Sequence, residues 1–249
     1  MNSVERARLV RHNPMIQPDE EQRWRETRVA IAGMGVGAGI ALQLGLVGAG
    51  ELRICDGDAI ELSNLNRHPI ATVEDIGCLK EDVVAHHLDA LGVEVAVRDR
   101  IEEFAHAEEF VAGSSVVIEE VDQFPVKWWL RHSAKEHGVC LITATDLWDR
   151  VVIDVEDYAR EPDWEPFHDL VSPSLSVGEA QLQLFGRHCS SQFLEAVKAR
   201  RSGFPQFAPT AAVAAGLVAA FVRELVILRS DRYRSGRYFF DLRDVQEAR

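Results

Sequence analysis

A glycine-rich turn between a short strand and an uncharged helix constrains the fold of this chain more than any other feature. The turn, Gly33-Met34-Gly35-Val36-Gly37-Ala38, follows the mostly apolar segment 28–32 and opens segment 38–47, which has no charged residue. Gly33 and Gly35 allow a tight turn and a close approach of backbone to phosphate, and Ala38 lets helix and strand pack closely. The first N–H groups of the helix then favour an anion. This order predicts a nucleotide-binding α/β unit.

The segments that follow predict a mostly parallel sheet. The second strand, 51–56, ends in Asp56, about 20 residues after Gly33, which is the spacing of a ribose-binding acid. Strand and helix patterns then alternate through residue 144, which indicates crossover units with helices on both faces, and a changed pattern after residue 151 indicates a mixed extension. The fold class is therefore α/β and Rossmann-like. Ligands of such sheets lie at strand C-termini, where we expect Asp56, Asp122 and Thr143.

The length of 249 residues suits one large domain or two small ones. We expect a single domain that comprises a helical arm (1–27), a nucleotide-binding core (28–156) and a C-terminal part (157–249). The C-terminal part should contain crossover loops, a helix and a final strand at 237–242. The long apolar run, 210–228, includes Arg223 and Glu224, so we interpret it as a buried helix and not as a membrane span.

Composition excludes several classes of protein. The net charge of −13 argues against broad affinity for nucleic acids or anionic membranes. Residues 1–28 are strongly charged and do not resemble a secretion signal. The cysteines are scattered without a C-x-x-C pair, which predicts reduced thiols in the cytoplasm, with no disulfide framework and no zinc site; they are Cys55, Cys78, Cys140 and Cys189.

Two cations beyond Asp56 indicate which nucleotide is bound. Arg67 and Lys80 near one nucleotide suit a triphosphate better than the two phosphates of NAD. Asp58 and Asp122 are hard oxygen donors that suit Mg²⁺ held mainly by phosphate and water. Such charges stabilise pyrophosphate as it departs. Each residue also has an ordinary alternative, namely a surface arginine, a solvated lysine and a helix-capping aspartate, but their joint spacing favours the nucleotide.

Together these segments resemble the ThiF/MoeB/HesA family, the bacterial relatives of ubiquitin-activating enzymes. The resemblance covers roughly residues 8–160 and, more loosely, the segment from Ala208-Pro209 to the C-terminus. Its motifs are Gly33-x-Gly35-x-x-Ala38, Asp56-x-Asp58-x-x-Glu61-x-Ser63-Asn64-Leu65-Asn66-Arg67, Gly77-x-x-Lys80 and Asp122.

The resemblance implies an activity. Members bind ATP with Mg²⁺ and adenylate a carboxylate, commonly the C-terminus of a small ubiquitin-like protein. The substrate is then expected to be such a protein, a peptide or a small molecule. Members are typically homodimers in which an N-terminal arginine reaches the partner's ATP. We expect loops 160–176 and 202–209 to border the acyl-substrate channel.

The resemblance also implies residue roles. Asp56 contacts the ribose, and Mg²⁺ is held through ATP at Asp122. Phosphates are contacted by Asn66, Arg67 and Lys80, with Asn64 in support, and catalysis rests on Arg67, Lys80 and Asp122. The remaining nucleotide-binding positions are Gly33, Gly35 and Asp58.

Several departures from the family pattern leave alternatives open. Pro14 stands where the second arginine of an Arg-x-x-Arg pair is expected, which leaves Arg8 or Arg11 as a substitute, and Gln123 replaces an asparagine. Arg201 occupies the place of a crossover-loop cysteine, and we interpret the nearest thiol, Cys189, as structural.

These departures motivate a second hypothesis: a catalytically degenerate nucleotide-binding partner or scaffold subunit of the same family. Activation of a tRNA base, as in some relatives, ranks third because the chain is acidic. An NAD-dependent dehydrogenase ranks fourth because it leaves segment 64–80 unexplained.

Overall fold

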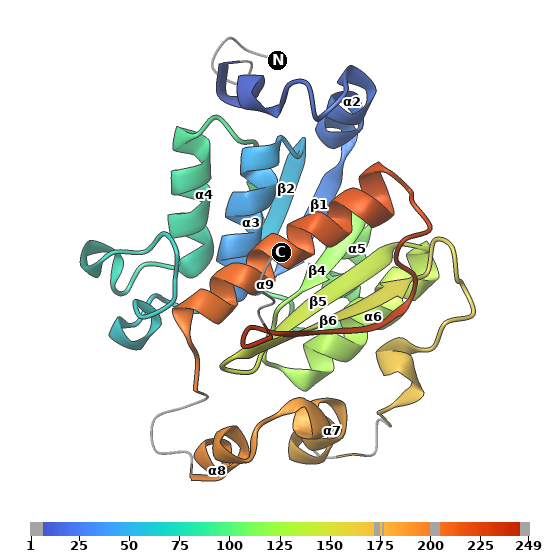
Figure 1. The fold of residues 1–249 in the computed structure, drawn as a ribbon. Coiled ribbons are helices and arrows are strands. Elements are labelled where there is room, and N and C mark those ends of the chain that lie inside the picture. The colour runs from blue at the N-terminus through green and yellow to red at the C-terminus, as the bar shows by residue number, and fades with distance from the viewer. Residues whose placement is uncertain (1–6, 172–174, 176, 200–204, 245–249) are drawn as a thin grey trace.

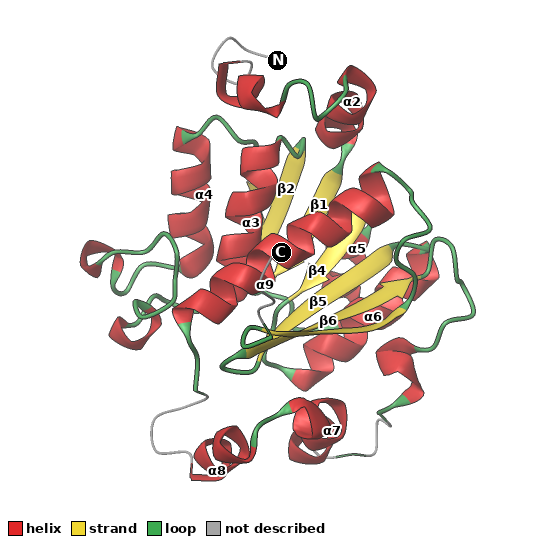
Figure 2. Cartoon of the chain, in the orientation of Figure 1, coloured by secondary structure: helices red, strands yellow, loops and turns green. Residues whose placement is uncertain are grey.

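A seven-stranded sheet forms the centre of the computed structural model, which describes residues 7–171, 175, 177–199 and 205–244. The strand order is β3-β2-β1-β4-β5-β6-β7. The pairs among β1 to β5 are parallel, whereas β6 pairs antiparallel with both β5 and β7. This confirms the predicted parallel sheet with a mixed extension (Figures 1 and 2). The strands are β1 (Arg28–Ala32), β2 (Glu51–Cys55), β3 (Val95–Val97), β4 (Val116–Glu119), β5 (Cys140–Asp146), β6 (Arg150–Asp157) and β7 (Gly236–Asp241).

Helices cover both faces of the sheet, as predicted (Figure 2). One face carries α3 (Val36–Val47), α4 (Lys80–Ala90) and α9 (Ala208–Val222), and the other carries α5 (Phe104–Val111) and α6 (Phe124–His137). Side chains alternate between the faces along each strand. Accordingly, Val116 and Ile118 of β4 pack beneath α3 and α9, while Val117 packs beneath α5 and α6.

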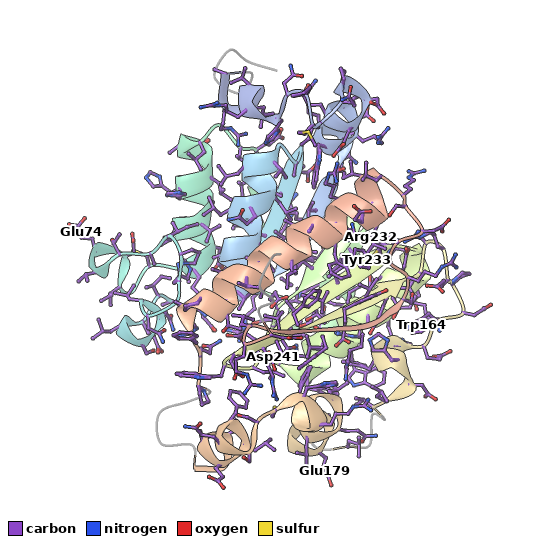
Figure 3. The ribbon with its side chains drawn as sticks, in the orientation of Figure 1. Glu74, Trp164, Glu179, Arg232, Tyr233 and Asp241 are labelled. Carbon is purple, nitrogen blue, oxygen red and sulfur yellow. The ribbon has the colours of Figure 1, made fainter. Side chains whose placement is uncertain are left out.

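The remaining elements lie at the two ends of the sheet. Figure 1 shows α2 (Pro18–Glu26) at one end and α7 (Val177–Phe185) and α8 (Ser191–Ala199) at the other. The segment between β2 and α4 makes a long excursion, at whose outer end Figure 3 shows Glu74 pointing away from the body. The short helical turns are η1 (Val10–His12), η2 (Leu62–Asn64), η3 (Val73–Asp75), η4 (Pro166–Asp169), η5 (Gly186–His188) and a π-helical turn, η6 (Arg223–Ile227).

The long apolar run forms a core helix, in agreement with its predicted burial. Val218 and Phe221 of α9 are buried in the main core, and Tyr233 (Figure 3) stacks on Phe221 with ring centroids 4.2 Å apart. By length and composition alone, Ala208–Ile227 could cross a membrane, but half of the tested window is buried inside the protein.

A buried ion network fixes α6 to the sheet. Arg131 of α6 is 3% exposed, and its guanidinium pairs with Glu119 of β4 and, through Nε at 3.2 Å, with Oε1 of Glu156 of β6. Nζ of Lys127 lies 2.7 Å from Oε1 of Glu119. The network joins one helix to two strands.

Candidate nucleotide-binding site

The glycine turn is shaped for the close approach of a ligand at the start of α3. Gly33 has φ +94°, and a Cβ at this position would lie 2.4 Å from the carbonyl oxygen of Glu120, so no larger residue fits without movement of the backbone. Gly35 is the N-cap of α3 and has no side-chain capping bond, and the first turn of the helix contains no acid. A Cβ on Gly35 would meet nothing within 4 Å. These features fit an anion at the helix N-terminus.

Asp56 is held against this turn. Its carboxylate accepts the N–H of Met34 at 2.5 Å and that of Asp58 at 2.9 Å, and its side chain is 8% exposed. The sequence therefore folds so that the acid after β2 meets the turn after β1, because adjacent parallel strands end at the same edge. This is the juxtaposition expected of a ribose-binding acid.

Lys80 joins Asp56 at the start of α4. Its Nζ lies 3.5 Å from Oδ1 of Asp56 and 3.1 Å from Oδ2 of Asp58. Asp58 also pairs with Arg100, whose Nη1 is 3.4 Å from Oδ1. The two aspartates neutralise the ammonium group of Lys80, so phosphate groups entering the site would compete with them for it.

The excursion between β2 and α4 positions the asparagines and Arg67. Oδ1 of Asn64 accepts the N–H of Glu61 at 3.0 Å and so stabilises the turn. Asn66 accepts Nη1 of Arg67 at 3.0 Å and donates Nδ2 to the carbonyl oxygen of Gln206 at 3.5 Å. Asn66 thus connects the arginine with the segment that leads into α9.

Electrostatics connect Arg67 with two carboxylates. Burial lowers the pKa of Arg67, while the charges of Asp146 and Asp122 oppose that change. Asp122 is exposed, and Gln123 is the N-cap of α6 without a side-chain capping bond, so Asp122 does not cap this helix.

The donor set agrees with Mg²⁺ held mainly by phosphate. In the described residues no group of three His, Cys, Asp or Glu could hold a metal ion. An exposed carboxylate beside the predicted phosphate cations fits a metal that arrives with ATP and keeps most of its ligands as phosphate oxygens and water.

The structure adds candidate site residues that the sequence did not reveal. Asp146, 6% exposed, ends β5 beside Arg67, and burial raises its pKa. The one sequence signal for Asp146 is its position at the C-terminal end of a parallel strand. The predicted strand ended at residue 144, so Asp146 fell outside it. Burial lowers the pKa of His68, as do the nearby cations Lys80 and Arg67, and its Nδ1 accepts the N–H of Ala71 at 3.0 Å.

Glu120 is another such residue. It is partly exposed as a residue, but its carboxyl group is tucked against β5 and accepts the N–H of Ala144 at 2.7 Å. Desolvation raises its pKa well above the ordinary value.

Other predicted residues lie elsewhere. Sγ of Cys189 donates to the carbonyl oxygen of Phe185 at 3.3 Å, and burial raises the pKa of this thiol, which suits a structural cysteine. All four cysteines are free. Arg201 lies outside the described residues, as do parts of the two loops expected to border the acyl-substrate channel.

The N-terminal arginines lie away from the site. Arg8 donates Nη1 to the carbonyl oxygen of Gly45 at 2.8 Å, at the C-terminal end of α3. Arg11 is exposed.

Comparisons with known proteins agree with this geometry. The ThiF family model matches residues 7–242. An uncharacterized protein of Mycobacterium tuberculosis is 35% identical over 252 residues, which cover 92% of this chain and 34% of that protein. The SAMP-activating enzyme E1 of Haloferax volcanii is 31% identical over 148 residues, 57% of this chain and 54% of the enzyme. The chain thus spans about a third to a half of these relatives.

A solved structure supports the fold over almost the whole chain. The crystal structure of PaaA has a TM-score of 0.75 at 24% identity and covers 99% of this chain and 82% of that one.

Proposed function

The chain belongs to the ThiF family, and from this premise we propose that it is an ATP-dependent adenylyltransferase of ubiquitin-activating type. It forms an acyl-adenylate and pyrophosphate from ATP and the carboxylate of a small ubiquitin-like protein, a peptide or a small molecule. One observation carries the proposal: Asp56 binds the glycine turn through Met34 at 2.5 Å and lies 3.5 Å from Nζ of Lys80. Similarity to a SAMP-activating enzyme supports it.

The residues suggest a mechanism without a protein nucleophile. Asp56 accepts hydrogen bonds from the ribose, and the N-terminus of α3 with Lys80 and Arg67 binds the phosphates. The substrate carboxylate attacks the α-phosphorus in line; the new bond is O–P, and the bond to the β-phosphate oxygen breaks, with its electron pair leaving on pyrophosphate. Asp122 would hold Mg²⁺ mainly through the phosphates of ATP, and the metal would supply positive charge that stabilises the leaving pyrophosphate.

ATP–pyrophosphate exchange with a panel of peptide and small-molecule carboxylates tests the proposal. We expect Arg67→Ala to lower the exchange rate about 10²–10³-fold, the effect of losing one charge-stabilising donor. Arg28→Ala is the matched control, because Arg28 is exposed and pairs with Glu51 at the opposite end of β1. Failure of the wild-type protein to bind ATP, or undiminished exchange by Arg67→Ala, would contradict the proposal.

The second hypothesis, a degenerate partner or scaffold subunit, is favoured by two observations. Pro14 stands in the place of an arginine, and Arg8 is bonded within its own chain. Turnover by the purified chain rejects this hypothesis, whereas turnover only with a second subunit supports it. The single domain, the homodimer, Mg²⁺ and the cytoplasmic location stay predictions.

A further inference from the structure

Asp146 has an unsatisfied oxygen at the edge of the sheet that carries the predicted nucleotide site. The residue is 6% exposed, and Oδ2 is enclosed without a hydrogen-bond partner in the described part of the chain. The side chain of Gln206 lies near its carboxyl group, which also interacts with the charges of Arg67 and Asp122. Leaving a buried carboxylate oxygen unsatisfied costs free energy, so a donor is expected there.

The side chain points to the face of the sheet that carries the start of α3. Alternate residues of a strand share a face, and Ala144, two positions earlier, packs in the core beneath α3 and α9. Glu120, which bonds the N–H of Ala144, lies near enough to Asp146 for their charges to interact. Asp146 is therefore on the same side of the sheet as the proposed phosphate site.

The segment that leads into α9 is bonded both to the excursion between β2 and α4 and to the hairpin between β5 and β6, in which Asp146 lies. Asn66 donates to the carbonyl oxygen of Gln206 at 3.5 Å, and Thr210 donates its hydroxyl to the carbonyl oxygen of Trp148. The rings of Trp148 and Phe207 stack with centroids 5.1 Å apart and remain 46% and 42% exposed. Arg67 is thereby connected through Asn66 to the segment near Asp146, and the aromatic pair next to it is open to solvent.

We propose that Asp146 forms a subsite for an N–H group of the acyl substrate, next to the carboxylate that is adenylated. The inference rests on the proposed function and names its substrate class: carboxylates with an N–H donor on the α-carbon, as in peptide C-termini and amino acids. The α-nitrogen is two bonds from the carboxyl carbon, so a group that recognises it has to flank the phosphate site, as Asp146 flanks Arg67. The charge of Asp146 also repels the substrate carboxylate and directs it toward the cations.

Stable acyl-adenylate mimics test this without knowledge of the natural substrate. The probes are sulfamoyl-adenosines acylated with N-acetylglycine, with glycine, or with acetoxyacetic acid, in which oxygen replaces the N–H. We expect the wild-type protein to bind the N-acetylglycyl probe about 10- to 100-fold more tightly than the acetoxyacetyl probe by calorimetry, the effect of one hydrogen bond to a charged group. The glycyl probe distinguishes preference for an ammonium from preference for an amide.

Variants assign the preference to Asp146. In Asp146→Ala the two affinities should agree within about threefold, and Asp146→Asn, which keeps the shape, should lose most of the preference. Asp149→Asn is the matched control, because Asp149 lies in the same hairpin and pairs with Nε of Arg243 at 2.9 Å through Oδ2; it should keep the full preference. Thermal unfolding verifies that each variant is folded.

The outcomes separate the two proposals. Equal affinities in the wild-type protein, or a preference that survives both Asp146 substitutions while adenosine ligands still bind, overturns the subsite alone. If no probe binds, including the unacylated sulfamoyl-adenosine, the proposed function fails and the subsite fails with it.

Discussion

Gly33 and Gly35 belong to one motif but meet different physical constraints. Gly33 has φ +94° and no space for a Cβ, whereas Gly35 has φ −79° and open space around it. We expect Gly33→Ala to lower the free energy of unfolding by more than about 1 kcal/mol, because both the backbone angle and the clash oppose it. Gly35→Ala meets no clash, so it should cost less stability than Gly33→Ala, and it should weaken ATP binding because its Cβ would fill part of the open space at the start of α3. Urea unfolding and calorimetry measure the two effects, and equal loss of stability in both variants would contradict this reasoning.

His68 predicts a pH dependence of stability. Its pKa in the folded protein is lower than the ordinary 6.5, chiefly through burial, so the unfolded chain binds the proton more readily. Its contribution is therefore complete above pH 6.5 and is lost as the pH falls toward the folded pKa, with a slope of at most about 1.4 kcal/mol per pH unit. His68→Gln should flatten the fall in unfolding free energy between about pH 7 and pH 5.

His137→Gln, at an exposed position, is the matched substitution that controls for the loss of a histidine as such. His188, whose pKa burial also lowers, contributes a part of the slope that remains in both variants. A wild-type slope in His68→Gln would show that this imidazole does not titrate as inferred.

The sequence predicted those candidate site residues whose positions follow directly from the order of strands and helices along the chain. Gly33 and Asp56 meet because each ends one of two adjacent strands, which follows from the strand–helix–strand pattern. Asp146 and Gln206 are 60 residues apart in the chain and come near each other because α9 packs across β5 and β6. No local sequence pattern encodes that proximity.

Helix α6 is held against the sheet by buried ion pairs, which the pattern of hydrophobic residues in the sequence does not predict. Arg131→Met leaves Glu119 and Glu156, both 0% exposed, without their shared guanidinium. We expect a loss of about 3–5 kcal/mol in the free energy of unfolding, the cost of breaking a buried pair. The control, Arg28→Met, removes a guanidinium that is 61% exposed and should cost less than about 1 kcal/mol. Similar losses in both variants, measured by urea unfolding, would contradict the structural role of the network.

The sequence predicted most elements to within a few residues, and the deviations have physical causes. The strand expected to stop at residue 144 continues to Asp146 because it pairs with β6 through the hairpin turn, where Asp146 lies opposite Val151. The helix expected over 210–228 begins at Ala208, since Pro209 is favoured in a first helical turn, and changes to a π-helical turn at Arg223.

For the molecule as a whole, the N-terminal arm and the candidate site lie at opposite ends of the sheet (Figure 1). The arm leads into the start of β1, whereas the glycine turn follows its end, five residues later. At about 3.3 Å per residue the two ends are about 17 Å apart. Arg11 on the arm is exposed, and Arg8 is occupied at the end of α3. Among the described residues of the arm, Arg8 and Arg11 lie at the far end of the sheet from the candidate site of their own chain, so the predicted trans arginine would have to act on a second copy.

Mixing two inactive variants tests this arrangement of a predicted homodimer. If Arg11 acts across the interface, Arg11→Ala and Arg67→Ala each impair every site when assayed alone. A mixed dimer then contains one site that lacks both arginines and one site that has both. Random exchange of subunits makes about half of the dimers mixed, and one of the two sites in each mixed dimer is complete. The rate of ATP–pyrophosphate exchange should therefore recover to about one quarter of the wild-type value. In the control pair, Arg8→Ala and Arg67→Ala, every Arg8→Ala subunit keeps a complete site, so the mixture should show about half of the wild-type activity, which is the sum of its two components without a gain on mixing. A mixture of Arg11→Ala and Arg67→Ala that stays as inactive as its components would exclude Arg11 as the shared arginine.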